Sequence, residues 1–215
     1  MPTVLGASAS PFVRKVRVVL AEKGIAYDHK PVRPRSTNPE FRKVSPLGKI
    51  PAFVDGDFAI CDSSVICAYL ERVHPAPAMY PHPPKDFARA LWYEEYGDTV
   101  LAQGATFGTF GRKIVAPLSG QPVDEAAIRK TVEEELPPVF DWLEGEVGTR
   151  EFLVGERFSI ADVSIATHFV NFRHAGFDVD AARWPRLASW VTHHLARPIF
   201  VQLAAEDRQA LGLPG

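Results

Sequence analysis

The sequence predicts two domains, an α/β domain at residues 1–78 and an all-helical domain at residues 86–215. The first prediction rests on a strand–helix–strand order at the start of the chain and on an Asp-Gly turn between two β-prone runs. The second rests on apolar residues at helical spacing and on the lack of a convincing strand after Asp86. Between the domains, five prolines within residues 74–84 (HPAPAMYPHPP) favour a connecting segment over a helix.

The chain opens with a predicted strand at residues 2–6 (PTVLG). Ser10 and Pro11 then form a helix start, with serine as N-cap and proline at the first helical position. Gly24 ends this helix, and residues 25–32 (IAYDHKPV) are the next predicted strand. A connection this short between the two strands predicts a right-handed parallel crossover.

Residues 33–47 are polar and interrupted by proline, with one helical turn predicted at residues 40–43. A β-hairpin is predicted over residues 52–60, because Asp55-Gly56-Asp57 separates AFV from FAI. A helix from Ser63 to about Val73 follows. The resulting order, βαβ-α-ββα, is that of a thioredoxin-like domain.

The helical domain begins with a long amphipathic helix predicted from Asp86 to about Ile114. Glycines in its later turns indicate bending or close packing; they are Gly104, Gly108 and Gly111. A helix from Asp124 to about Gly145 is predicted to kink or break at Pro137-Pro138.

Ser159 with Asp162 three residues later, before an apolar run, is close to a capping box and predicts another helix start. Two further helices are predicted at the end of the chain, from residues 184–185 to Leu195 and from Pro198 to about Leu211.

Composition narrows the classes of function. A net charge of −2 argues against a nucleic-acid partner, and no apolar run reaches the roughly 18 residues that span a bilayer. The first residues lack the basic region of a signal peptide. Two cysteines provide no disulfide framework, and the seven histidines show no metal-ligand spacing. We therefore expect a cytoplasmic protein that binds no metal, membrane or nucleic acid.

The hairpin region also has the features of a ligand site. Pro51 starts a strand, and a cis bond after Ile50 would turn the Ile50 backbone away from the sheet, towards a peptide-like ligand. Asp62 and Ser63 offer a carboxylate and helix-start N–H groups close by. Such a site suits a small zwitterionic peptide. The same residues equally fit a hairpin and a capped helix without a ligand.

These motifs support a family resemblance. GKIP, the hairpin and Asp62-Ser63 resemble the glutathione-binding half of the cytosolic glutathione transferases, although glutamate is commoner there than Asp62. SPFVRKVRVVLAEKGIAYD resembles the serine-type classes, tau and related bacterial proteins, and SIADVSIA resembles the capping motif of their helical domain. The resemblance covers nearly the whole chain. It implies a glutathione S-transferase acting in detoxification.

Ser10 is the candidate catalytic residue. The glutathione thiol, with an ordinary pKa of about 8.5, must be held as thiolate for transfer. A serine hydroxyl at a helix N-terminus can donate to that sulfur, and Arg14 could add positive potential if it pointed back. Ser10 could instead be a plain N-cap, and Ser8 is a rival donor. Cysteine-type classes have cysteine at this position, so its absence argues against thiol–disulfide exchange.

For the remaining glutathione contacts, the resemblance implies Lys49 at the glycyl carboxylate, Ile50 at the cysteinyl backbone, and Asp62 with Ser63 at the γ-glutamyl end. Pro51, Phe12 and Ser36 complete the expected glutathione site, with Ser36 standing where relatives often have lysine. Lys49 could also be an ordinary solvated lysine. The expected co-substrate pocket consists of Phe12, Leu101, Ala105 and Phe107, although such residues also suit a core.

The resemblance further implies a homodimer and a small hydrophobic electrophile as second substrate. Two alternatives stay open. One is a non-catalytic binding or regulatory module on the same fold. The other is glutathione-dependent isomerisation, dehalogenation or ether cleavage, which the sequence does not separate from conjugation.

Overall fold

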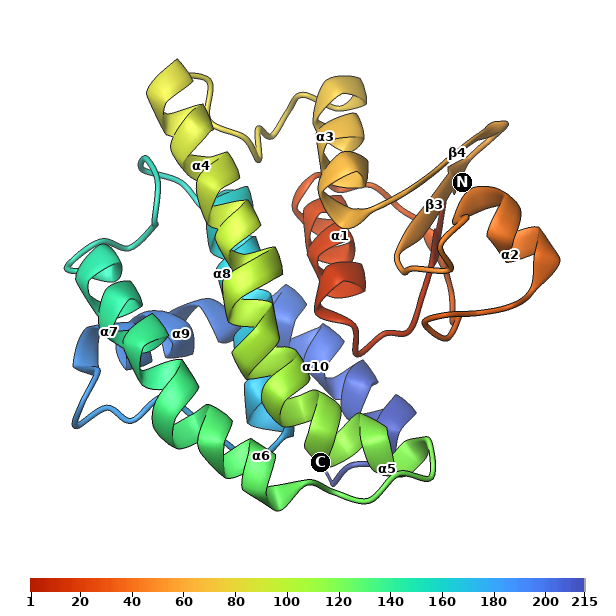
Figure 1. Ribbon diagram of the computed structural model, residues 1–215. Helices are drawn as coiled ribbons and strands as arrows, with labels where there is room; N and C mark the ends of the chain where they lie inside the picture. Colours follow the sequence, from red (N-terminus) through yellow and green to blue (C-terminus); the bar gives the residue numbers. More distant parts are fainter. Residues whose placement is uncertain (215) are drawn as a thin grey trace. The chain divides into compact units, whose positions relative to one another are not determined.

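The computed structural model describes residues 1–214, which form two compact units. Within the described residues, the first unit consists of Met1–Tyr80 together with residues 201–214, and the second unit is Pro81–Phe200 (Figure 1). Most of the last helix, which the sequence analysis places in the helical domain, is grouped here with the first unit.

The first unit contains a four-stranded sheet in the order β2-β1-β3-β4. Its strands are β1 (Thr3–Leu5), β2 (Asp28–Lys30), β3 (Ala52–Asp55) and β4 (Phe58–Cys61). β1 pairs in parallel with β2 and antiparallel with β3, and β3 pairs antiparallel with β4 across a turn at Gly56-Asp57. The predicted thioredoxin-like order is confirmed, although β2 is three residues long where eight were predicted.

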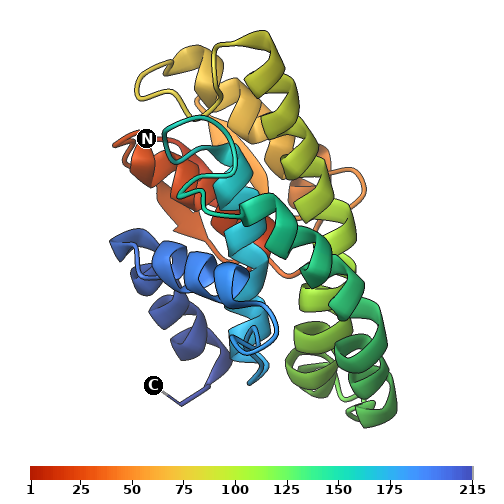
Figure 2. The ribbon, with the colours of Figure 1, turned by 90° about the vertical axis from the view of Figure 1, so that its left-hand side faces the viewer.

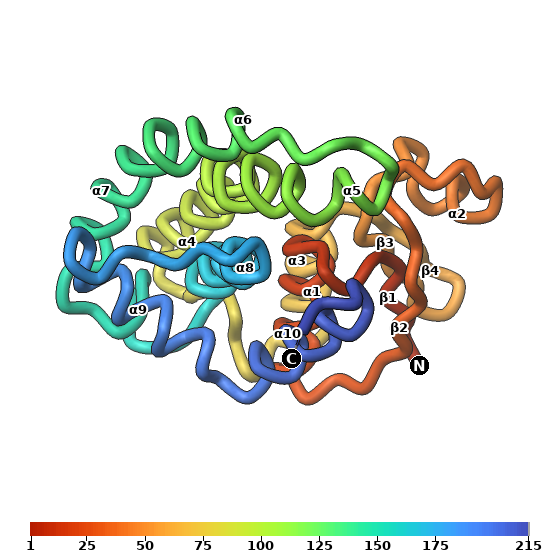
Figure 3. The backbone as a smooth tube through the Cα atoms, turned by 90° about the horizontal axis from the view of Figure 1, so that it is seen from below, coloured from red at the N-terminus to blue at the C-terminus, as the bar shows by residue number. Residues whose placement is uncertain are grey.

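Two helices cover one face of this sheet. α1 (Pro11–Glu22) and α3 (Ser63–Val73) lie side by side there, while α2 (Pro39–Val44) lies towards the other face (Figures 1 and 3). α1 begins as predicted, with Ser10 as N-cap and Pro11 in the first turn. One face is apolar, with fully buried side chains at Val13, Val16 and Leu20, although Arg14 and Lys15 on the same helix are also 0% exposed. Burying this face against the sheet fixes the position of the helix start.

The second unit is built around one long helical run. α4 (Pro84–Tyr96) continues into η1 (Gly97–Val115), a π-helix, and ends in α5 (Ala116–Leu118). The predicted helix is confirmed, but its wide π form was not predicted. α8 (Ile160–His174) runs beside it (Figure 2).

Glycines allow η1 to approach several neighbouring helices closely. A Cβ on Gly97 would come within 2.6 Å of the Ser164 carbonyl oxygen, and one on Gly104 within 2.5 Å of Leu136 Cδ2. A Cβ on Gly108 would lie 2.6 Å from Thr131 Cγ2. Close packing is therefore confirmed at Gly104 and Gly108. At Gly111 a Cβ would meet no atom closer than 3.4 Å, so this glycine serves no such contact.

The predicted helix at residues 124–145 is present as α6 (Glu125–Lys130), η2 (Thr131–Glu135) and α7 (Leu136–Val147). A wide π turn thus lies immediately before Pro137-Pro138. Proline cannot donate to the preceding turn, and its ring crowds the carbonyl there, so a locally widened helix accommodates both residues.

α8 begins at the predicted capping box. The Asp162 carboxylate accepts hydrogen bonds from the Ser159 N–H at 2.9 Å and from the Leu153 N–H at 2.8 Å. α9 (Pro185–Leu195) and α10 (Pro198–Leu211) follow, close to their predicted bounds. Throughout residues 1–214, no helix is both long enough and apolar enough to cross a bilayer.

Candidate active site

The sheet register gathers three chain segments at one edge. Leu5 at the end of β1 pairs with Ala52 at the start of β3, and Ala52 pairs with Cys61 at the end of β4. The segments that continue from these residues therefore emerge together: the β1–α1 loop, Ile50-Pro51 and Asp62. Direct contacts agree, because the Asp62 N–H donates to the Pro51 carbonyl at 3.3 Å. A Cβ on Gly6 would lie 3.2 Å from Ile50 Cβ.

Ser10 lies at the N-terminal end of α1 at this edge. Its backbone is extended (φ −73°, ψ 126°), and its Oγ accepts a hydrogen bond from the Val13 N–H at 3.4 Å. A hydroxyl that accepts in this way keeps its own hydrogen for donation. Ser10 is half-buried, as is Ser8 in the preceding turn, but it is Ser10 that caps the helix. Its hydroxyl therefore lies where the helix dipole favours an anion.

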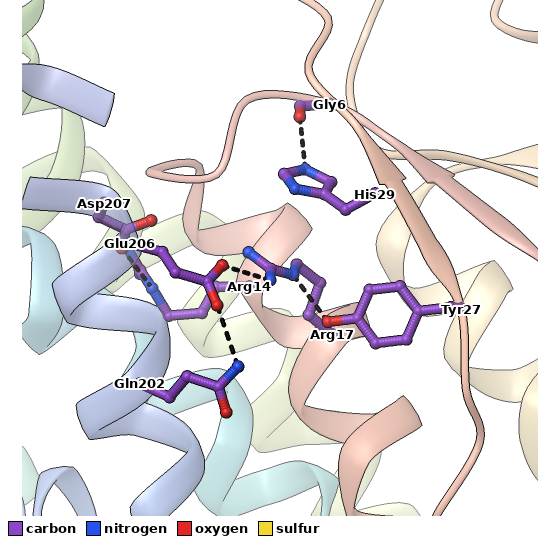
Figure 4. Close-up of polar contacts among 8 residues, drawn as sticks. All are labelled: Gly6, Arg14, Arg17, Tyr27, His29, Gln202, Glu206 and Asp207. Carbon is purple, nitrogen blue, oxygen red and sulfur yellow. Dashed lines mark hydrogen bonds and ion pairs between the residues drawn. The ribbon is translucent and has the colours of Figure 1, made fainter. Parts of the chain in front are cut away.

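Arg14, one turn further along α1, is bound to a carboxylate. Its Nε and Nη2 lie 3.1 Å and 2.5 Å from Asp207 Oδ2 on α10, and both side chains are 0% exposed (Figure 4). This ion pair offsets the guanidinium charge. The sequence-based suggestion that Arg14 adds positive potential at the sulfur therefore gains no support from the structure.

A second group of polar contacts lies beside this pair. Arg17 donates from Nη2 to Glu206 at 2.6 Å and from Nε to the Tyr27 hydroxyl at 2.8 Å (Figure 4). His29 Nε2 lies 2.9 Å from the Gly6 carbonyl oxygen, which can only accept, so Nε2 carries the hydrogen. Burial, with the nearby Arg17 charge, lowers the pKa of His29. This hydrogen bond holds the start of the loop that leads to Ser10.

Asp62 has the backbone geometry of an unusual site. Its φ is +84°, which is rare for a residue other than glycine and costs conformational energy. Its Oδ1 accepts hydrogen bonds from the N–H groups of Ser64 at 3.0 Å and Val65 at 3.3 Å, so it caps α3. Asp62 is exposed and Ser63 is buried. The Ile50-Pro51 peptide bond is cis.

Ser36 and Lys49 belong to neighbouring loops joined by an arginine that the sequence analysis did not single out. Arg42 on α2 donates from Nε to the Ser36 carbonyl at 2.6 Å and from Nη1 to the Pro46 carbonyl at 2.7 Å. The Arg35 N–H donates to the Gly48 carbonyl at 2.8 Å. Lys49 itself is exposed. In the sequence, the only sign of these hydrogen bonds is an arginine within a short predicted helix. That pattern is too common to predict which carbonyl groups the arginine binds.

The residues expected to line a co-substrate pocket differ in exposure. Leu101 and Ala105 on η1 are 0% exposed and belong to the core of the second unit. Phe107, on the same helix, is 48% exposed, and Phe12 on α1 is half-buried. The two phenylalanines are thus the expected pocket residues that present surface. Across residues 1–214, His, Cys, Asp and Glu side chains form no group of three or more suited to a metal ion.

Comparison with known proteins identifies the family. Residues 4–78 match the model of the glutathione S-transferase N-terminal domain, and residues 92–193 match that of the C-terminal domain. The uncharacterized GST-like protein YibF of Escherichia coli (strain K12) is 30% identical over 207 residues, which cover 93% of this chain and 96% of that protein. The chain belongs to the glutathione S-transferase family.

Other transferases agree with this assignment. A glutathione S-transferase of Triticum aestivum is 28% identical, over 93% of this chain and 91% of its own. The crystal structure of a glutathione S-transferase from Rhodospirillum rubrum F11 superposes with a TM-score of 0.86 at 27% identity, covering 94% of this chain and 91% of that chain.

The chain is thus a glutathione S-transferase, an enzyme whose family uses glutathione as co-substrate and acts on electrophiles. In this transferase, the sheet edge described above brings together Ser10, Ile50-Pro51 and Asp62, which the sequence analysis had selected separately. Their common position provides the setting for a proposed mechanism.

Proposed function

We propose that Ser10 holds glutathione as its thiolate, for attack on a small hydrophobic electrophile. The observation that carries this proposal is the position of Ser10 as N-cap of α1, at the sheet edge where Pro51 and Asp62 also lie. The serine hydroxyl would donate a hydrogen bond to the sulfur and would not act as a base. Hydrogen bonds to a charged acceptor are stronger than those to a neutral one, so the contact favours the thiolate over the thiol.

The helix start adds to this effect. α1 has 12 residues, and its N-terminus carries a partial positive charge close to Ser10. Each unit by which the thiol pKa falls requires about 1.4 kcal/mol of preferential stabilisation of the thiolate. A charge-assisted hydrogen bond of about 1.5–3 kcal/mol can supply one unit or more.

The rest of the peptide would extend along the same edge. Both N–H groups that Asp62 caps bind one oxygen, Oδ1, so its other oxygen could accept the γ-glutamyl ammonium, beside Ser63. The Ile50 backbone, next to Pro51, would pair with the cysteinyl residue. Lys49, Ser36 and Phe12 complete the proposed contacts, and Lys49 would neutralise the glycyl carboxylate.

For the electrophile we retain Phe12 and Phe107 as contact residues, because both present surface. Leu101 and Ala105 would then act only by supporting that surface. We further propose a cytoplasmic, homodimeric enzyme of detoxification. Exposed apolar side chains on α4, Leu91 and Trp92, support a subunit contact there.

The test is the thiolate absorbance of glutathione bound to the protein, titrated from pH 5 to 9. We expect a midpoint below that of free glutathione in the wild type and a return towards it in Ser10→Ala. Because alanine also removes the helix cap, Ser10→Gly serves as a second variant: glycine largely preserves the cap but lacks the hydroxyl. Both variants should behave alike, while Ser10→Thr should retain the shift.

Ser8→Ala is the matched control and should titrate as the wild type does. A shift that persists in both Ser10 variants and disappears in Ser8→Ala would transfer the role to Ser8. If glutathione does not bind at all, the catalytic proposal is lost and the non-catalytic module replaces it. If glutathione does bind, assays with electrophilic, isomerisable, halogenated and ether substrates would separate conjugation from the other glutathione-dependent reactions.

A further inference from the structure

We infer that Asp207, on the last helix, is a positioning residue for Ser10. The inference rests on the proposed role of Ser10, and it starts from the fully buried ion pair between Arg14 and Asp207. These residues are 193 positions apart in the sequence, and neither side chain has any exposed surface. Burying two charges is costly, so such a pair is weak evidence for a stabilising role. Its better-attested role is to fix one arrangement of the elements that it joins.

Arg14 is also the residue that closes the first turn of α1 on Ser10. Its backbone N–H donates to the Ser10 carbonyl at 2.9 Å. The same residue is therefore held at two points: its backbone by Ser10, and its guanidinium by the Asp207 carboxylate. Asp207 thus limits movement of the turn that carries the Ser10 hydroxyl.

The neighbouring pair fixes the rotation of the two helices. Arg17 lies one turn beyond Arg14 on α1, and Glu206 precedes Asp207 on α10. Arg17 Nη2 lies 2.6 Å from Glu206 Oε2, and Gln202 donates to Glu206 Oε1 at 3.0 Å (Figure 4). A single ion pair would let α1 and α10 rotate about it, whereas two neighbouring ion pairs restrict that rotation. Of the two, only the Asp207 contact reaches the turn that begins at Ser10.

Because the Arg14–Asp207 pair is net neutral, removing both charges leaves the overall charge near Ser10 unchanged. An effect of the paired substitution on the bound thiol would therefore not come from a change in net charge. This property allows a test in which positioning and electrostatics give different results.

The first measurement is amide hydrogen exchange in the protein without glutathione. In Asp207→Asn, we expect exchange of the Arg14 N–H to accelerate roughly tenfold more than that of the Phe53 N–H in β3. Local opening of the first turn of α1 exposes the Arg14 N–H, whereas the Phe53 N–H serves as the reference within the sheet. Glu206→Gln is the matched control and should not accelerate Arg14 selectively. Equal acceleration at Arg14 and Phe53 would show a purely structural role and overturn the inference.

The second measurement is the thiol titration of bound glutathione. Loss of positioning should raise the midpoint by about half a unit or more, which means about threefold less thiolate at acidic pH. In Asp207→Asn, the Arg14 charge that Asp207 no longer offsets opposes this rise, so the decisive protein is the one that loses both charges. The double variant Arg14→Met/Asp207→Leu, whose apolar pair keeps the fold better than a lone buried charge, should raise the midpoint by this amount. A double variant that folds and titrates as the wild type does would contradict the inference.

The two proposals fail in different ways. If wild-type protein shows no lowered thiol midpoint, or Ser10→Ala leaves it unchanged, the proposed role of Ser10 is wrong. Amide exchange at Arg14 would still decide whether Asp207 holds this turn. If Ser10→Ala shifts the midpoint and neither Asp207 variant does, only the positioning inference is lost.

Discussion

Lys23 and Glu71 join the C-terminal ends of α1 and α3, with 2.7 Å between Lys23 Nζ and Glu71 Oε2. Lys23 also donates to the carbonyls of His74 at 2.7 Å and Pro77 at 2.9 Å. Glu71 accepts the Met79 N–H at 3.1 Å, and the Tyr80 N–H lies 3.4 Å from its other oxygen. The proline-rich segment expected to be a simple connection is therefore bound to the first unit over residues 74–80.

Replacing Lys23 with methionine should destabilise the first unit by about 3 kcal/mol, because it leaves a largely buried carboxylate and two carbonyls without their cation. Urea unfolding measures this loss. Limited proteolysis should show faster cleavage within residues 74–80. The matched control is Lys43→Met, which breaks the exposed Lys43–Glu40 pair and should cost less than about 0.5 kcal/mol. Similar losses of unfolding free energy in the two variants would contradict a stabilising role for the Lys23 contacts.

Gly104 and Gly111 both lie on η1 and should respond differently to alanine. A methyl at Gly104 would collide with Leu136, so Gly104→Ala should destabilise the protein by about 1–3 kcal/mol. Gly111→Ala meets no close atom and should be neutral or stabilise by up to about 1 kcal/mol through helix propensity. Thermal unfolding of the pair tests this. A tolerated alanine at residue 104 would mean that α7 shifts easily away from η1.

His194 predicts a pH dependence of stability. Its Nε2 lies 2.9 Å from the Glu151 carbonyl oxygen, and Trp190 packs on its ring with 4.1 Å between ring centroids. Burial, together with the charges of His193 and Arg197, lowers the pKa of His194 to about 4. The unfolded chain binds a proton below its ordinary pKa near 6.5, while the folded ring stays neutral until about pH 4. Stability should therefore fall as pH decreases through that window, by at most about 3 kcal/mol.

The measurement is the free energy of unfolding at pH 7.5 and pH 4.5, compared between wild type and His194→Gln. The difference between the two proteins should shrink at the lower pH, since glutamine does not titrate. Comparing the proteins also cancels the opposite contribution of Asp162, whose pKa burial raises to about 7. His193→Gln, at an exposed neighbouring position, is the control. A difference that is constant with pH would show that His194 does not titrate as predicted.

Local signals in the sequence predicted the local features well. The Asp-Gly hairpin, the Ser10 cap with its following proline, and the Ser159–Asp162 box all appear in the structure. Each depends on residues within a few positions of one another, so its chemistry can be read without knowing the rest of the fold. The order of these elements, together with the family motifs, was sufficient to predict the fold class.

Features that depend on distant residues were not predicted. Nothing around Arg14 indicates that a carboxylate 193 residues away neutralises it, and nothing in the last helix indicates that it joins the first unit. The π form of η1 was missed because its apolar pattern also fits an α-helix. In the candidate site, the sequence identified residue types at the sheet edge, whereas the carboxylate partner of Arg14 could be found only from the packed structure.

The grouping of the last helix with the first unit has a consequence for synthesis. A ribosome makes the chain from its N-terminus, so Arg14 and Arg17 emerge long before Asp207 and Glu206, and the whole of Pro81–Phe200 is translated in between. The nascent thioredoxin-like portion must therefore hold two arginines without their final counterions. The first unit can be completed only after the helix that carries Glu206 and Asp207 has been synthesised.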